Sequence, residues 1–194
     1  MKQTFLQQII IISFFITISV ITDIFISSYI RLFKLPLVII FISGCLLGFP
    51  SVFLICCFYS FFHLIRSFSS WQPVMESLKL SFFQILLSVF LDYIFPDLII
   101  SISGFCFDKQ KKFFSNKRLF SVFLLINCLR LFSSFLSSFF IYSSSNERLA
   151  NNILVFVFIH NLIPFILNLF LGGLLVYYFK VQLKDFGDIK NKNF

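Results

Sequence analysis

The chain has 194 residues, of which 59% are hydrophobic and 12% charged, and its formal net charge is +8. A soluble domain has about 45–50% apolar and about 25% charged residues, so this chain carries too few polar side chains to coat a water-soluble globule. The composition excludes a soluble protein and predicts apolar helices that face lipid. We expect no nucleic-acid partner, because membrane topology explains the basic residues, as described below.

Six apolar stretches are long enough, or nearly so, to cross a bilayer as helices, which takes about 20 residues. They cover residues 5–30, 36–48, 51–64, 80–107, 119–142 and 149–179. The second and third are short, and the pair Gly48 and Pro50 predicts a tight turn between them. Residues 66–79 are predicted to form a polar loop, and residues 180–194 a polar tail. The sequence therefore predicts an all-α integral membrane protein, a six-transmembrane-helix bundle forming one transmembrane domain over residues 1–194.

Basic residues are distributed unevenly between the two faces of this arrangement. The most basic segment, residues 108–118, and the tail, residues 180–194, lie on the same face as the N-terminus. Cytoplasmic loops carry an excess of Lys and Arg, so we predict a multi-pass protein of the plasma membrane with both termini in the cytoplasm. Contact of these segments with anionic lipid or with a cytoplasmic partner is the alternative interpretation.

Signatures of enzymes and of metal sites are absent from the sequence. It contains no HExxH, no GxSxG and no P-loop. The cysteines lie in apolar runs, form no CxxC pair and are predicted to be packing residues: Cys45, Cys56, Cys57, Cys106 and Cys128. We therefore predict a non-enzymatic protein without cofactor or metal, in which any active transport draws its energy from a partner or an ion gradient.

Ionisable residues within the apolar stretches are the most informative positions, because each costs about 3 kcal/mol to insert. Asp92 and Asn161 each lie about a dozen residues into helices that enter from the outer face, so they are predicted to share a depth and to line an outward-facing pocket. The alternative is structural, with Arg130 and Asp97 forming an ion pair that holds the bundle together. Asp23 receives no role.

Two prolines and two histidines accompany these positions. Pro96 and Pro164 break two of the helices near the polar residues, which is tolerated where the freed backbone lines a cavity or meets another helix. His63 and His160 are single histidines on apolar helices and are predicted to be hydrogen-bonded packing residues rather than ligands.

Three segments, in their order along the chain, resemble motifs of one transporter family. They read VFLDYIFPDLIISISGF from Val89, LRLFSSFLSSFF from Leu129 and VFVFIHNLIPFIL from Val155. They are similar to family stretches of the form LDYPLAFxxLGLAG, LRYxxHxxSGxxFF and YSLIYNxxYxLP. By these motifs, their spacing and the topology, the chain resembles the thiamine-specific S-components of energy-coupling factor (ECF) vitamin transporters.

The resemblance implies a binding site with substitutions. Asp92 and Tyr93 fall on the family's acidic–Tyr pair, and Asn161 falls on its binding Asn. The family's stacking His falls at Ser134, and two aromatic positions of the last motif fall at Phe156 and at His160. The loop at residues 143–148 lacks the family's Trp. A carboxylate attracts the thiazolium cation, ring faces stack on it, and an amide pairs with the aminopyrimidine edge.

The implied function is that of a substrate-binding membrane subunit, an S-component, of an ECF-type importer for thiamine or a related vitamin or precursor. Such a subunit works with a membrane coupling subunit and two ATPase subunits. Ser13 and Thr17 form a small-xxx-small pair on the first span that permits contact with the coupling subunit. The alternatives are an S-component for a different vitamin, and a structural or assembly membrane protein without a small-molecule ligand.

Overall fold

A computed structural model describes residues 5–29, 33–78, 81–107, 116–143 and 161–192. Within these residues nearly all of the backbone is helical and no β-strand occurs, which confirms the all-α prediction. Helical segments long and apolar enough to cross a membrane are Phe5–Phe25, Phe49–Phe68, Phe82–Cys106, Lys117–Phe140 and Asn161–Gln182. The chain is therefore a multi-pass, all-α membrane protein.

The second predicted span differs from these five. Helix α2, Leu35–Leu47, has 13 residues and is about 20 Å long, whereas the hydrocarbon core of a bilayer is about 30 Å thick. It follows α1, Phe5–Tyr29, and precedes α3, Phe49–Leu78. Gly48, with a φ of 83°, makes the predicted tight turn between α2 and α3, because a positive φ is accessible to glycine at little cost.

The described residues beyond α3 form three more helical rods, of which two change their winding. The first consists of α4, Phe82–Val89, the π-helix η1, Phe90–Ile94, α5, Phe95–Ile99, and the 3₁₀-helix η2, Ile100–Cys106. The second is α6, Asn116–Ser143. The third comprises helical residues 161–167, the π-helix η3, Asn168–Gly172, and α8, Gly173–Lys192.

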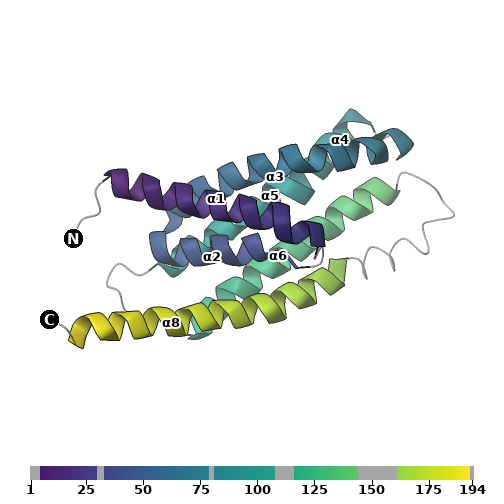
Figure 1. Cartoon of the computed structure of the whole chain (residues 1–194). Helices are drawn as coiled ribbons and strands as arrows, with labels where there is room; N and C mark the ends of the chain where they lie inside the picture. Colours follow the sequence, from purple (N-terminus) through teal and green to yellow (C-terminus); the bar gives the residue numbers. More distant parts are fainter. Residues whose placement is uncertain (1–4, 30–32, 79–80, 108–115, 144–160, 193–194) are drawn as a thin grey trace.

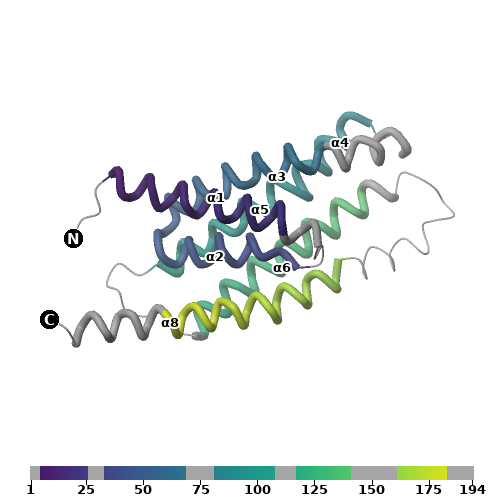
Figure 2. Tube along the Cα trace, in the orientation of Figure 1, coloured from purple at the N-terminus to yellow at the C-terminus, as the bar shows by residue number. Residues whose placement is uncertain are grey.

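These rods lie side by side as a bundle with its core around α2. Figure 1 shows the start of α1, the turn between α2 and α3, and the end of α8 at the same end of the molecule, and the trace in Figure 2 shows the same path. Helix α2 contacts α1, α3 and η2, and its buried side chains include Leu37, Val38, Ile40 and Phe41. Because α2 is apolar on all sides, it needs this cover from neighbouring helices.

The predicted polar loop at residues 66–79 is wrong. Helix α3 continues through Arg66 to Leu78 without a break. The charge of Arg66 is accommodated within the helix because its guanidinium donates to the Asp23 carboxylate and to the Asp23 carbonyl oxygen on α1. The predicted polar tail continues α8 as a helix as far as Lys192, and its Lys, Gln and Leu residues are good helix formers.

Two glycines permit close packing of η2 against its neighbours. A Cβ atom at Gly104 would lie 2.4 Å from the Phe49 Cα atom, and one at Gly44 would lie 1.9 Å from the Ser103 Oγ atom. These distances are far below van der Waals contact. The backbone of η2 therefore reaches the α2–α3 turn only because these positions lack side chains.

Gly104→Ala is expected to lower the free energy of unfolding by about 1–3 kcal/mol or more, since the added methyl meets backbone that cannot rotate away. Gly173→Ala is the matched control, because a Cβ atom there meets nothing within 4 Å. Denaturant titration of both variants in detergent micelles checks this. Equal stability of the two variants would contradict the packing described here.

Candidate functional site

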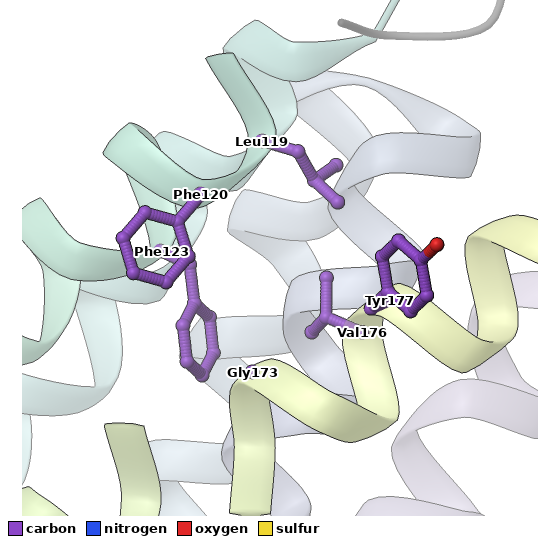
Figure 3. Close-up of a pocket in the computed structure, with 6 residues that line it drawn as sticks. All are labelled: Leu119, Phe120, Phe123, Gly173, Val176 and Tyr177. Atoms are coloured by element: carbon purple, nitrogen blue, oxygen red, sulfur yellow. The ribbon is translucent and has the colours of Figure 1, made fainter. Parts of the chain in front are cut away.

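Two hollows among the described residues bear on ligand binding, and the larger of them is an apolar groove between α6 and α8. It has a volume of about 230 Å³. Figure 3 shows its lining side chains, which are Leu119, Phe120, Phe123, Gly173, Val176 and Tyr177. Apart from the Tyr177 hydroxyl, these side chains offer nothing that distinguishes one polar ligand from another. The groove is therefore a poor candidate for recognition of a polar small molecule.

The smaller hollow, of about 100 Å³, is polar and lies among the spans. We call it the polar cavity. Its lining residues are Lys34, Leu37, Asp92, Pro96, Asn127, Arg130, Leu131, Ser134, Asn161, Pro164, Phe165 and Asn168. Asp92 and Arg130 are near the middle of their spans, Phe82–Cys106 and Lys117–Phe140. Ionisable groups at such depth typically face a cavity and mark substrate pathways, so the polar cavity is the candidate site.

Two helices present the same spacing of residues to the polar cavity. On α6 the lining residues are Asn127, Arg130, Leu131 and Ser134, at positions i, i+3, i+4 and i+7. On the last rod they are Asn161, Pro164, Phe165 and Asn168, again at i, i+3, i+4 and i+7. This spacing defines one face of a helix. Each helix therefore turns one stripe of residues toward the cavity, in which polar and apolar side chains are mixed, and leaves its other faces to lipid and to the core.

Asp92 reaches the cavity from the π-helix η1, whose winding is explained by Pro96. Proline has no N–H, so the carbonyl of Asp92, four residues earlier, receives no α-helical hydrogen bond from it. The Phe95 N–H bonds to the Phe90 carbonyl, which is the wider spacing of a π-helix. The Ser137 hydroxyl donates to the Asp92 carboxylate at 2.7 Å, and the Ser133 hydroxyl donates to the Leu91 carbonyl. The carboxylate is thus fixed by α6.

Asn161 is fixed by the same row of serines on α6. The Ser134 hydroxyl donates to its side-chain oxygen at 2.7 Å, and its side-chain nitrogen donates to the Ser138 hydroxyl at 3.4 Å. Because hydroxyls on one helix orient both the acid and the amide, the α6 serine row sets the geometry of the candidate site.

Asn168 connects the last rod to the start of α2. Its side-chain oxygen accepts from the Lys34 N–H at 2.9 Å, and its side-chain nitrogen donates to the Pro164 carbonyl at 2.6 Å. The second bond satisfies a carbonyl in the turn that precedes the π-helix η3. Such π-helical turns are rare and frequently occur at functional sites, and this protein has one on each of two rods at the polar cavity.

The other buried acids, Asp97 and Asp23, contact residues that do not line the polar cavity. Asp97, which is 1% exposed, contacts the His63 Nδ1 atom at 2.8 Å, and Asp23 pairs with Arg66. The predicted ion pair between Arg130 and Asp97 is therefore wrong. His63 projects from α3 to Asp97 on α5, whereas Arg130 lines the polar cavity. The interpretation of His63 as a hydrogen-bonded packing residue is confirmed.

The structure brings some of the predicted site residues together and separates others. Asp92, Ser134 and Asn161 line one cavity. Tyr93 lies on η1 but does not line it, and its ring packs edge-on against His63 with 5.1 Å between the centroids. Phe156 and His160 lie outside the described residues.

The two residues predicted to contact a coupling subunit lie on α1. Ser13 and Thr17 are exposed on this helix. Only 11% of the residues in the most apolar stretch of α1 are buried, the smallest share of the five span-length segments. Both side chains are therefore on the surface of the bundle, away from the polar cavity.

Three polar residues of the cavity were missed from the sequence: Lys34, Asn127 and Asn168. The two asparagines carry a signal in their spacing, since each lies seven residues from Ser134 or Asn161 on an otherwise apolar helix. Lys34 lies between the first and second apolar stretches of the sequence, and only its position at the start of α2 in the structure shows that it lines the cavity. Among the described residues, no cluster of His, Cys, Asp and Glu has the composition of a metal site.

Comparison of the chain with family models, with curated proteins and with solved structures gives no match.

Proposed function

We propose that this protein is the substrate-binding membrane subunit of an uptake system, similar to an ECF S-component, and that it binds a small vitamin-like molecule at the polar cavity. The observation that carries the proposal is the convergence of a carboxylate, three amides and two positive side chains on one hollow among the spans. Polar groups are expensive at this depth, and their arrangement around a hollow favours a ligand over purely structural pairing.

The proposed topology has six crossings with both termini in the cytoplasm of a cell bounded by the plasma membrane. The short helix α2 and α3 together provide the second and third crossings. Energy for transport comes from a coupling subunit and two ATPase subunits, which fits a chain without nucleotide-binding motifs. The exposed surface of α1 around Ser13 and Thr17 is proposed to contact the coupling subunit.

Thiamine or a related vitamin or precursor is the proposed ligand. Asp92 offers a carboxylate to the thiazolium cation, and Asn161 offers both a donor and an acceptor to the aminopyrimidine edge. The cavity of about 100 Å³ is smaller than the roughly 300 Å³ of pockets that hold a whole drug-sized ligand. In this proposal it therefore receives one end of the molecule.

Ligand binding by the purified protein in detergent tests the proposal. Asp92→Asn and Asn161→Ala are each expected to weaken thiamine binding about tenfold or more, because the first removes the charge that attracts the cation and the second removes a hydrogen-bonding group from a desolvated site. Tyr177→Phe, in the apolar groove, is the control and should bind like the wild type. Equal binding by wild type and by both cavity variants would contradict thiamine recognition at this site.

A different vitamin is the second candidate, and the positive side chains of Lys34 and Arg130 favour it, since they oppose a cationic ligand. A thermal-stability screen separates the two candidates. A ligand at about 100 times its dissociation constant stabilises the folded state by about 2.7 kcal/mol. A screen in which no small molecule stabilises the protein would favour the structural or assembly role instead.

A further inference from the structure

The polar cavity contains two positive side chains, and among the described residues neither has an anionic partner. Lys34 and Arg130 both line the cavity. The ion pairs of the described chain join other residues, namely His63 with Asp97 and Arg66 with Asp23. Two positive charges at one hollow within the spans repel each other, and the single carboxylate of Asp92 can offset only one of them, so an anion bound between them is stabilised.

The acids near the cavity offset this charge only in part. Asp92 lines the cavity and attracts Lys34, and its carboxylate also accepts the Ser137 hydroxyl on α6 at 2.7 Å. Asp97 does not line the cavity and contacts the His63 ring. Asp23 lies outside the cavity and is bound by Arg66. The described lining therefore contains two cationic groups and one carboxylate, and it offers more positive than negative charge to a ligand.

The surrounding fold fixes the backbone at both Lys34 and Arg130. Lys34 precedes α2, and its backbone N–H is held by Asn168 at 2.9 Å. Arg130 lies on the α6 stripe, one turn from both Asn127 and Ser134. A guanidinium presents a planar fork of donors that matches a carboxylate or a phosphate, and an ammonium adds a point charge. Preorganised groups of this kind recognise an oxyanion without first rearranging the backbone.

We infer that the end of the ligand bound in the polar cavity is an oxyanion, a carboxylate or a phosphate, held between Lys34 and Arg130. The inference rests on the proposed function, and among its candidate ligands it favours a vitamin or precursor that carries an anionic group over thiamine itself. A volume of about 100 Å³ admits such a group but not a complete vitamin. The Asp92 carboxylate then accepts a hydrogen bond from a donor elsewhere on the same molecule. The ligand is an acid or a zwitterion, not a simple cation.

Matched pairs of small molecules that differ only in this group test the inference. The probes are thiamine monophosphate against thiamine, nicotinate against nicotinamide, pantothenate against pantothenol, and pyridoxal phosphate against pyridoxal. Each is assayed by thermal shift and then by titration with purified full-length protein in detergent. For the pair that binds, the anionic member is expected to bind at least about tenfold more tightly, the usual size of one charge-assisted hydrogen bond.

Three variants test whether the preference for the anionic member of a pair depends on Lys34 and Arg130. Arg130→Gln and Lys34→Gln are each expected to abolish most of the preference for the anionic member, whereas Arg130→Lys retains the charge and part of the preference. Lys117→Gln removes the same charge from an exposed position at the start of α6 and should leave the preference unchanged. If Arg130→Gln fails to fold, the comparison of Arg130→Lys with wild type decides, because loss of the fork weakens binding of a carboxylate.

The outcomes separate the inference from the proposed function. Tighter binding of the uncharged or cationic member by wild type, with loss in Asp92→Asn, would overturn the inference and leave the proposed function standing. An anionic preference that survives both Gln substitutions would also overturn it. Failure of every probe to stabilise the wild-type protein would overturn the proposed function and the inference with it.

Discussion

His63→Leu is expected to lower the free energy of unfolding by about 3 kcal/mol or more, because it leaves a buried carboxyl group without its hydrogen-bond partner. The Asp97 carboxylate is 1% exposed, and the His63 Nδ1 atom lies 2.8 Å from it. Without the imidazole, the carboxylate has lost its hydrogen-bond partner in an apolar surrounding. Packing is lost as well, since the His63 ring stacks on Tyr59 with 5.6 Å between the centroids. Denaturant titration in detergent micelles measures the change.

Removal of both partners is the control for this prediction. The double variant His63→Leu with Asp97→Leu is expected to be more stable than His63→Leu alone, because no unpaired acid remains in the core. Unfolding is followed by reaction of a thiol dye with the buried cysteines Cys45 and Cys56. If the single and double variants unfold at the same denaturant concentration, the His63–Asp97 contact does not stabilise the bundle.

Asn168→Leu is expected to lower the free energy of unfolding by about 2–4 kcal/mol. The substitution keeps the approximate side-chain volume but leaves the Lys34 N–H without its partner, and it also removes the side-chain bond to the Pro164 carbonyl. Each unsatisfied buried group costs about 1–3 kcal/mol. Asn168 is 7% exposed, so water does not readily replace the lost bonds. Loss of the bond to Lys34 also releases the start of α2, so ligand affinity is expected to fall together with stability.

The matched control for Asn168→Leu is Asn127→Leu. Asn127 is 3% exposed and lines the same cavity, but its side-chain nitrogen donates at 2.9 Å to the Phe123 carbonyl within its own helix. That carbonyl lies inside α6, where the backbone supplies a partner, so the substitution is expected to cost less than half as much. Equal costs for the two substitutions would show that the connection from the last rod to Lys34 contributes little.

The local features of this fold, namely its apolar helices and a tight turn, can be predicted from the sequence of each segment. The apolar stretches, their approximate order and the tight turn at Gly48 all follow from hydropathy and from glycine's tolerance of a positive φ. Polar residues inside those stretches identify α6 and two other rods as the elements that line a cavity, because their burial in lipid would be costly. This reasoning predicts that Asp92 and Asn161 line the same cavity.

The partners of the buried charged residues cannot be predicted in this way, because they depend on which helices pack against each other. The pairing of Asp97 with His63 rather than with Arg130 is determined by the packing of α3 against α5. The continuation of α3 past Arg66 depends on Asp23 from α1, 43 residues earlier. Nothing in the immediate sequence of Arg66 indicates that its charge has a partner at this depth, so a polar loop was the wrong prediction.

The sequence by itself determined that this is an all-α membrane protein whose helices present isolated polar positions, because hydrophobic length and the cost of buried charge are properties of each segment alone. Only the tertiary structure decided that Lys34 and Asn168 join Asp92 and Arg130 at one hollow, and that Tyr93 turns away from it. The reason is physical: contacts between residues as distant as Lys34 and Asn168 arise from how the helices pack against one another, and single-helix periodicity carries no information about that packing.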